Sequence, residues 1–146
     1  MTETIRVLIA EDNEDHIFLA IRALRDLNGT HLEVDAVRDG AEALEYIRGL
    51  GRFSERSLPH LILLDIRMPK VDGLEVLKVL KEDPAFKVIP VVMLSASERP
   101  EDIDTSYKLG ANSYVTKPAG VGAFTEGIAR LKQYWTDINT LPVAQE

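Results

Sequence analysis

Five short apolar runs, separated by segments of helical period, are spaced along the 146-residue chain. We expect a strand at each run, over residues 5–10, 32–37, 61–64, 91–94 and 113–116. The runs at 61–64 and 91–94 are continuous rather than alternating, which is typical of strands buried on both faces of a parallel sheet. The run at 32–37 is more mixed, as expected of an edge strand.

The segments between these runs place apolar residues three or four positions apart, the spacing of one helix face. We expect helices over residues 14–27, 40–49, 73–82, 100–109 and about 121–136. Asp72 is a plausible N-cap of the third helix, and Asp83-Pro84 ends it. Pro100 suits a first helical turn, and Gly110 suits a C-cap. A strand–helix unit therefore occurs five times, and right-handed crossovers make the fold a doubly wound α/β sheet.

A single domain is expected over residues 1–136, followed by a loosely ordered C-terminal tail over residues 137–146. Residues 50–59 form a longish polar loop. The apolar stripe of the last helix ends at Trp135, late in the helix, where we expect the sheet beneath to have ended. We therefore expect this indole to be exposed. An exposed aromatic ring at that position would suit an interface.

Composition and net charge argue against several classes of partner and binding site. A net charge of −7 argues against a nucleic-acid partner, because such proteins need a basic face toward the phosphates. The sequence has no cysteine, which excludes disulfides and thiolate metal sites. It shows neither an apolar run of membrane-spanning length nor a secretion signal, so we expect a cytoplasmic protein with no membrane partner. Any output is then expected to pass through contact with another protein.

Reactive or ion-binding residues follow four of the five expected strands: Glu11, Asp12, Asp65, Ser95 and Lys117. Each of them alone could merely cap a turn or lie on the surface. In open α/β sheets, however, ligands bind outside the carboxyl ends of the strands, so we expect these side chains to meet in one crevice. Three carboxylates would repel one another there, and Mg²⁺, which prefers oxygen ligands, removes that penalty. An aspartate among the ligands can then attack phosphorus, with the ammonium group offsetting charge.

These residues lie in motifs that resemble those of response-regulator receiver domains, the CheY-like family. The motifs occupy residues 7–12, 63–69, 72–73, 94–96 and 114–118, and the resemblance extends over residues 5–135. It implies a flavodoxin/CheY-like (βα)₅ fold with a parallel five-stranded sheet in the order 2-1-3-4-5. It also implies a phosphoacceptor signalling domain that catalyses only its own phosphorylation and dephosphorylation.

The resemblance assigns the phosphoacceptor and the metal ligands. Asp65 would accept the phosphoryl group from a partner's phosphohistidine. Glu11 and Asp12 would bind Mg²⁺ together with Asp65 and the main-chain carbonyl of Arg67. The side chain of Arg67, two residues after the phosphoacceptor, would modulate hydrolysis of the phosphoryl group.

The resemblance also assigns the residues around the phosphoryl group. Ser95 and Lys117 would bind its oxygens. Ser95 and Tyr114 would form the switch that reports phosphorylation, and Ser97 would modulate the lifetime of the phosphorylated state. The peptide bond between Lys117 and Pro118 would be cis.

A narrower resemblance concerns the loop before the third strand, the stretch at 58–65 and the ending at 134–142. These segments are similar to small receivers that work with bacterial and cyanobacterial phytochrome kinases, lack an output domain and tend to dimerise. The resemblance implies a sensor histidine kinase as phosphodonor, with a bacteriophytochrome as the favoured candidate. It also implies a homodimer through the fourth helix, fifth strand and fifth helix.

Two other functions stay open at this point. A phosphatase of the haloacid-dehalogenase type also uses an aspartyl nucleophile, but it needs a second acid two residues later, where this chain has Arg67. A flavodoxin-like cofactor binder needs a phosphate-cradling loop after the first strand, where Glu11 and Asp12 would repel phosphate. The three histidines are scattered and form no metal-binding pair, and we expect His16 to lie on the surface.

Overall fold

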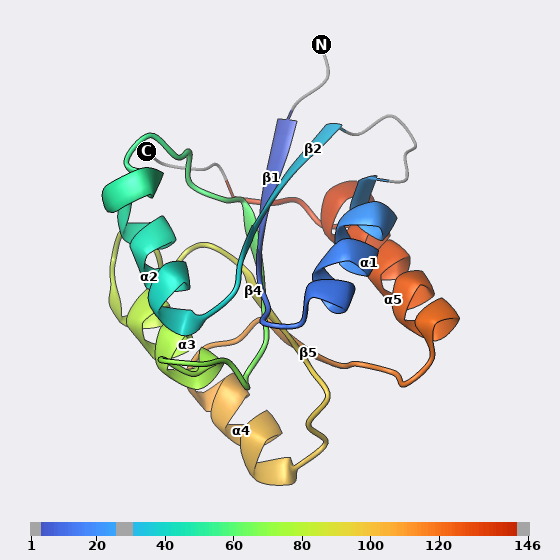
Figure 1. Cartoon of the computed structure of the whole chain (residues 1–146). Coiled ribbons are helices and arrows are strands. Elements are labelled where there is room, and N and C mark those ends of the chain that lie inside the picture. The colour runs from blue at the N-terminus through green and yellow to red at the C-terminus, as the bar shows by residue number, and fades with distance from the viewer. Residues whose placement is uncertain (1–3, 26–30, 143–146) are drawn as a thin grey trace.

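Five parallel strands form one sheet in the order β2-β1-β3-β4-β5 in the computed structural model, which describes residues 4–25 and 31–142 (Figure 1). The strands are β1 (Thr4–Ala10), β2 (His31–Val37), β3 (Leu61–Leu64), β4 (Val91–Ser95) and β5 (Ser113–Thr116). The predicted fold class and strand order are therefore confirmed. Within the described ranges, no helix combines the length and apolar character needed to cross a membrane.

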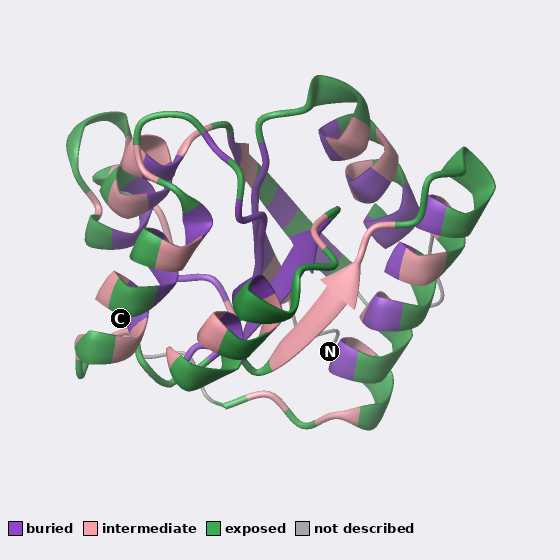
Figure 2. Ribbon diagram, turned by 90° about the horizontal axis from the view of Figure 1, so that it is seen from below, coloured by how far each residue is buried: buried purple, intermediate pink, exposed green. Residues whose placement is uncertain are grey.

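Helices cover both faces of the sheet. They are α1 (Glu14–Arg25), α2 (Gly40–Arg48), α3 (Gly73–Glu82), α4 (Pro100–Lys108) and α5 (Val121–Gln133), with a 3₁₀ turn η1 (Gly51–Phe53) and a π-helical turn η2 (Tyr134–Ile138). Helices α1 and α5 lie on one face, and α2, α3 and α4 lie on the other (Figure 1). Figure 2 shows the molecule from below, with the buried sides of the helices turned toward the sheet.

Strands β3 and β4 are buried along their whole length, as their continuous apolar runs predict. Alternate side chains of β3 enter opposite cores: Ile62 and Leu64 pack with α2 and α3, whereas Leu61 and Leu63 pack with α1 and α5. This division follows from the two-residue period of a strand. The result is a rigid sheet whose loops carry the polar residues at its carboxyl edge.

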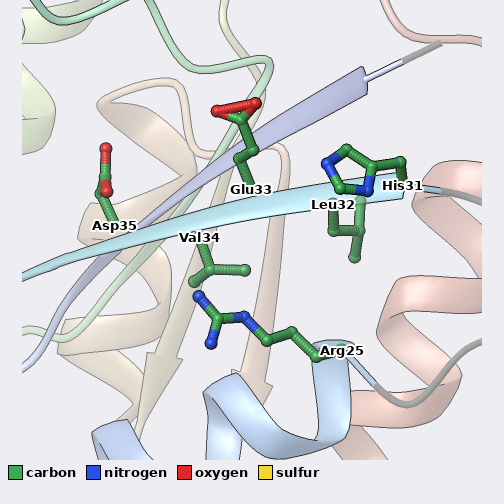
Figure 3. A pocket seen from close by; sticks show the side chains of 6 residues that line it. All are labelled: Arg25, His31, Leu32, Glu33, Val34 and Asp35. Carbon is green, nitrogen blue, oxygen red and sulfur yellow. The ribbon is translucent and has the colours of Figure 1, made fainter.

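The edge strand β2 alternates between buried and exposed positions. Leu32 and Val34 lie on the side of α1 and Arg25, whereas Glu33 and Asp35 point to the opposite side of the strand (Figure 3). Acidic residues on an exposed edge discourage pairing with another sheet. The pocket at this edge lies at the opposite end of the sheet from β5. None of the predicted site residues lines it.

Capping residues set the helix boundaries as the sequence predicts. The Asp72 side chain accepts a hydrogen bond from the Glu75 N–H at 3.0 Å, and α3 ends at Glu82. Gly110 follows α4 with a φ of 107°, a conformation that glycine adopts without strain. The first helix is described to Arg25, and the predicted end at residue 27 lies outside the described residues.

The prediction for Trp135 is wrong. Its side chain is buried, with 8% of the residue exposed, and it packs in the core between the sheet, α1 and α5. Helix α5 continues into the π-helical turn η2, which contains Trp135, and Leu141 packs against the same core. The core beside α1 and α5 therefore extends to the position that was expected to be open. The domain boundary at residue 136 stays a prediction, and residues 143–146 lie outside the described ranges.

Candidate functional site

Three carboxylates from two strand ends meet at the carboxyl edge of the sheet. Glu11 and Asp12 follow β1, Asp65 follows β3, and one oxygen of each lies within 4.8 Å of the others. The parallel pairing of β1 with β3 explains this, because Ala10 lies beside Leu64 and its carbonyl accepts a hydrogen bond from the Asp65 N–H at 3.0 Å. We call these three residues the acidic cluster.

Lys117 extends from the end of β5 into the acidic cluster. Its Nζ donates hydrogen bonds to Glu11 Oε1 and, at 3.2 Å, to Asp65 Oδ2, and its side chain is only 5% exposed. The Lys117 N–H also donates to the Ser95 carbonyl at 2.8 Å, which fixes the end of β5 beside the end of β4. A buried ammonium group among carboxylates offsets part of their mutual repulsion.

The electrostatics of the acidic cluster favour a cation. The pKa of the Glu11 carboxyl is raised to about 7, mainly by burial, with the hydrogen bond from Lys117 lowering it and the charge of Asp65 raising it. One ammonium group is therefore not enough to stabilise all three carboxylates as anions. Oxygen ligands of this kind and number fit Mg²⁺, which binds through carboxylates and completes its shell with other oxygens.

Ser95 and Tyr114, the predicted switch pair, lie on adjacent strands and are linked through Ser97. Ser95 is buried, and its Oγ accepts a hydrogen bond from the Ser97 N–H at 3.2 Å. The Tyr114 hydroxyl donates to the Ser97 carbonyl at 2.9 Å. Both side chains thus contact Ser97 on the loop after β4, and the structure shows no direct hydrogen bond between Ser95 and Tyr114 among the described residues.

His16 lies beside the site and at the surface at the same time, since 37% of its side chain is exposed. Its Nδ1 is 3.2 Å from Lys117 Nζ and 3.7 Å from Glu11 Oε1, and its ring stacks on Phe124 at 5.2 Å. Burial lowers the pKa of the imidazole, and Lys117 lowers it further, so the neutral ring can accept a hydrogen bond from the ammonium group. Its place four residues after Asp12 puts it near the end of β1, but its contacts with Lys117 and Phe124 depend on how α1 packs against α5.

Asp102 is a second residue that the sequence did not single out. It is buried in the first turn of α4, and its Oδ2 accepts hydrogen bonds from Arg67 Nη2 at 3.0 Å and Ser97 Oγ at 2.6 Å. Arg67 is therefore held toward α4 by an ion pair. No local signal in the sequence links residues 67, 97 and 102, because only the pairing of β3 with β4 brings their loops together.

The peptide bond between Lys117 and Pro118 is trans, because no cis bond occurs within the described residues. The predicted cis bond is wrong in this structure. A proline lowers the preference for trans to about 0.5–1 kcal/mol without reversing it. A sequence can therefore mark where a cis bond is accessible, while the surrounding backbone decides which isomer is present.

Gly73 allows close packing against the backbone of Asp65. Its N–H donates to the Ile66 carbonyl at 2.7 Å, and a Cβ at this position would lie 1.9 Å from the Asp65 carbonyl oxygen. We expect Gly73→Ala to lower the free energy of unfolding by about 1–3 kcal/mol, because one of two backbone segments must move. Urea denaturation measures the change.

Gly127→Ala is the matched control for this substitution. A Cβ at Gly127, in the middle of α5, would meet nothing within 4 Å. Alanine should therefore stabilise the helix there by up to about 1 kcal/mol. Equal effects of the two substitutions would show that the close contact at Gly73 is not present in solution.

The sequence from residue 7 to residue 129 matches the response regulator receiver domain. The chain belongs to this family, and its fold and the position of its acidic cluster agree with that assignment. Its structure is similar to that of the phosphorylated cyanobacterial phytochrome response regulator RcpA. The two are 41% identical with a TM-score of 0.93, covering 97% of this chain and 100% of that one.

Two further relatives are similar over most of their length. Response regulator Rcp1 of Synechocystis is 34% identical over 138 residues, covering 94% of this chain and 93% of Rcp1. Its Mn²⁺-bound crystal structure has a TM-score of 0.91 at 32% identity, covering 95% of this chain and 99% of that one. The probable methanogenesis regulatory protein FilR2 of Methanothrix harundinacea is 39% identical over 136 residues, covering 93% of this chain and 86% of FilR2.

Proposed function

We propose that this protein is a single-domain response regulator that accepts a phosphoryl group on Asp65 from a sensor histidine kinase, in a Mg²⁺-dependent reaction. The observation that carries the proposal is the meeting of the acidic cluster with the Lys117 ammonium group in a chain of the receiver family. The family also favours a signalling domain over a phosphatase or a flavodoxin-like cofactor binder. Transfer of labelled phosphoryl from a kinase or a small phosphodonor tests the proposal.

In the proposed reaction, an Asp65 carboxylate oxygen attacks the phosphorus atom of a phosphohistidine. The P–O bond forms as the P–N bond breaks, and the electron pair of that bond stays on the imidazole nitrogen. The Ile66 N–H donates to Asp65 Oδ1 at 2.7 Å and Lys117 donates to Oδ2, so both oxygens are oriented before the partner arrives. Lys117 and the Ser95 hydroxyl then bind phosphoryl oxygens.

Glu11, Asp12, Asp65 and the main-chain carbonyl of Arg67 would hold Mg²⁺. When bound, the ion supplies positive charge to the phosphoryl oxygens during transfer. The three carboxylates of this chain would keep it beside Asp65, and their mutual repulsion would fall as it binds. The raised pKa of Glu11 supports this role, since a buried carboxyl without enough positive charge nearby favours its neutral form.

A groove of about 990 Å³ between α1 and α5 supports a protein as phosphodonor. Phe18 and Val121 line it and are 62% and 63% exposed. Val121 begins the helix that follows Lys117, and Phe18 lies on α1 two residues after His16. Large exposed apolar side chains close to a reaction centre are typical of a protein-binding surface.

The proposed output is a change in protein–protein contacts through α4, β5 and α5, including a homodimer. The phosphoryl group adds about −1.5 to −2 charges at neutral pH, and Ser95 and Tyr114 would transmit its presence to this surface. Similarity to RcpA, a cyanobacterial phytochrome response regulator, supports a phytochrome kinase as donor. Phosphotransfer profiling against the histidine kinases of the organism tests this, and transfer only from other kinases would contradict the phytochrome assignment.

Magnesium should stabilise the protein more at pH 8 than at pH 5. Without metal, the pKa of Glu11 is about 7 in the fold against 4.5 for an ordinary glutamate. Between pH 4.5 and about 7 the folded state therefore binds more protons than the unfolded state, and the free energy of unfolding falls as the pH rises through this range. Mg²⁺ at a hundred times its Kd should add about 2.7 kcal/mol at pH 8, whereas protons compete with it at pH 5. Urea denaturation in EDTA and in Mg²⁺ measures both effects.

Asp12→Asn should remove most of the stabilisation by Mg²⁺. Asp104→Asn is the control, because Asp104 is exposed on α4 and pairs with Lys108 at 2.9 Å, outside the acidic cluster. It should respond to Mg²⁺ as the unaltered protein does. An equal response of both variants would place the ion elsewhere.

A further inference from the structure

Asp102 binds the two side chains that flank the candidate site. It is only 7% exposed, although an acid in a first helical turn can interact with the helix dipole while fully exposed. Its Oδ2 accepts hydrogen bonds from Arg67 Nη2 and Ser97 Oγ. Arg67 lies two residues after Asp65, and Ser97 lies two residues after Ser95. The burial of Asp102 thus connects α4 with both loops of the reaction centre.

Ser97 extends these contacts to β4 and β5. Its N–H donates to Ser95 Oγ at 3.2 Å, its hydroxyl donates to Asp102, and its carbonyl accepts from the Tyr114 hydroxyl at 2.9 Å. All three polar groups of one residue are therefore used within the site. A movement of Ser95 toward a phosphoryl group would pull on the same loop that holds the Asp102 carboxylate.

The ion pair between Arg67 and Asp102 is uneven in exposure. The Arg67 side chain is 60% exposed, whereas the Asp102 side chain is 10% exposed. The guanidinium group is hydrated when it leaves the pair, so the cost of separation falls mainly on the carboxylate. A buried charge that loses its partner is strongly destabilised. Arg67 is therefore the member of the pair that can change partner. Asp102, on α4, is the member that is affected when Arg67 leaves.

We propose that Arg67 exchanges between two anionic partners, Asp102 before phosphorylation and the phosphoryl group on Asp65 after it. The exchange rests on the proposed function, because it requires a phosphoryl group at Asp65. That group offers three acceptor oxygens and about −1.5 to −2 charges, so it competes well for a guanidinium held by one carboxylate oxygen. Asp102 is then a positioning residue, and losing Arg67 loosens the first turn of α4.

A double-mutant cycle tests the exchange with beryllium fluoride and Mg²⁺, a non-covalent mimic of a phosphoryl group on a carboxylate. Calorimetry gives its affinity for the unaltered protein, Asp102→Asn, Arg67→Gln and the double variant. Asp102→Asn should tighten binding about three- to tenfold, because Arg67 no longer leaves a charged partner. In the Arg67→Gln background the same change should have no effect. Equal effects in both backgrounds would overturn the exchange.

Hydrogen exchange of the α4 amides gives an independent readout and does not depend on how well Asp102→Asn folds. The mimic should lower protection in the first turn of α4 in the unaltered protein. Arg67→Gln should show the lowered protection without the mimic. Arg99→Gln is the matched control, because Arg99 is exposed on the same loop and pairs with Glu101 at 3.1 Å. Unchanged protection in Arg67→Gln would overturn the exchange.

The outcomes separate this inference from the proposed function. If the mimic fails to bind the unaltered protein, or binds Asp65→Asn equally well, both the phosphoacceptor role and the exchange are wrong. If it binds the unaltered protein and not Asp65→Asn, while Asp102→Asn acts independently of Arg67, only the exchange is wrong.

Discussion

Asp65→Asn should lower the rate of phosphoryl acceptance by more than about a thousandfold, the scale on which removal of a nucleophile acts in enzymes. The carboxamide lacks the negative oxygen that attacks phosphorus and removes one charge from the acidic cluster. Its carbonyl oxygen can still accept the hydrogen bond that the Ile66 N–H donates to Asp65 Oδ1, so the loop should keep its conformation. Labelled phosphoryl from a cognate kinase or a small phosphodonor, followed over time, measures the rate.

The control for this experiment is Asp104→Asn, which changes the same functional group at an exposed position of α4. It should accept phosphoryl at the rate of the unaltered protein. Urea denaturation of both variants separates loss of reactivity from loss of fold. Acceptance by Asp65→Asn at the unaltered rate would move the phosphoacceptor to another residue, and hydroxamate formation with hydroxylamine would show whether the product is still an acyl phosphate.

Trp135→Ala should lower the free energy of unfolding by about 3–5 kcal/mol, because it removes a large ring from a packed core. Trp135 lies buried in the core formed by the sheet, α1 and α5, and Leu141 packs against the same core. The loss should not depend on protein concentration if the ring is buried within one chain. Urea denaturation at several protein concentrations measures both the size of the loss and its concentration dependence.

Tyr134→Ala is the neighbouring control. Tyr134 is 47% exposed and meets the Trp135 ring edge-on at 5.3 Å. Its removal should lower the free energy of unfolding by no more than about 1.5 kcal/mol, the upper value of such a ring contact. A Trp135→Ala variant that stays stable and associates more weakly would place Trp135 at an interface between chains.

Element type and many boundaries could be predicted because they depend on short-range interactions. The bounds of β3 and α3 agree with the prediction, since a continuous apolar run defines one and the Asp72 cap begins the other. The end of α5 could not be predicted in this way. The π-helical turn η2 and the packing of Leu141 depend on a core that forms only when distant segments meet.

Some residues of the candidate site could likewise be predicted from the sequence, whereas the place of others depends on tertiary packing. Glu11, Asp12, Asp65 and Lys117 could be found from the sequence because each directly follows a strand, and parallel strands bring such positions to one edge. The place of His16 beside Lys117 also depends on how α1 packs against α5, which its position along the chain does not reveal.

The sequence by itself determined the order of strands and helices, the family and the residue types available for metal binding and phosphoryl transfer, because these depend on periodicity, caps and motifs within short segments. Tertiary structure alone decided the burial of Trp135, the trans bond before Pro118 and the pairing of Arg67 with Asp102. The burial of Trp135 and the pairing of Arg67 with Asp102 depend on contacts between segments far apart in the chain, and the free energies of these contacts are fixed by the packed fold.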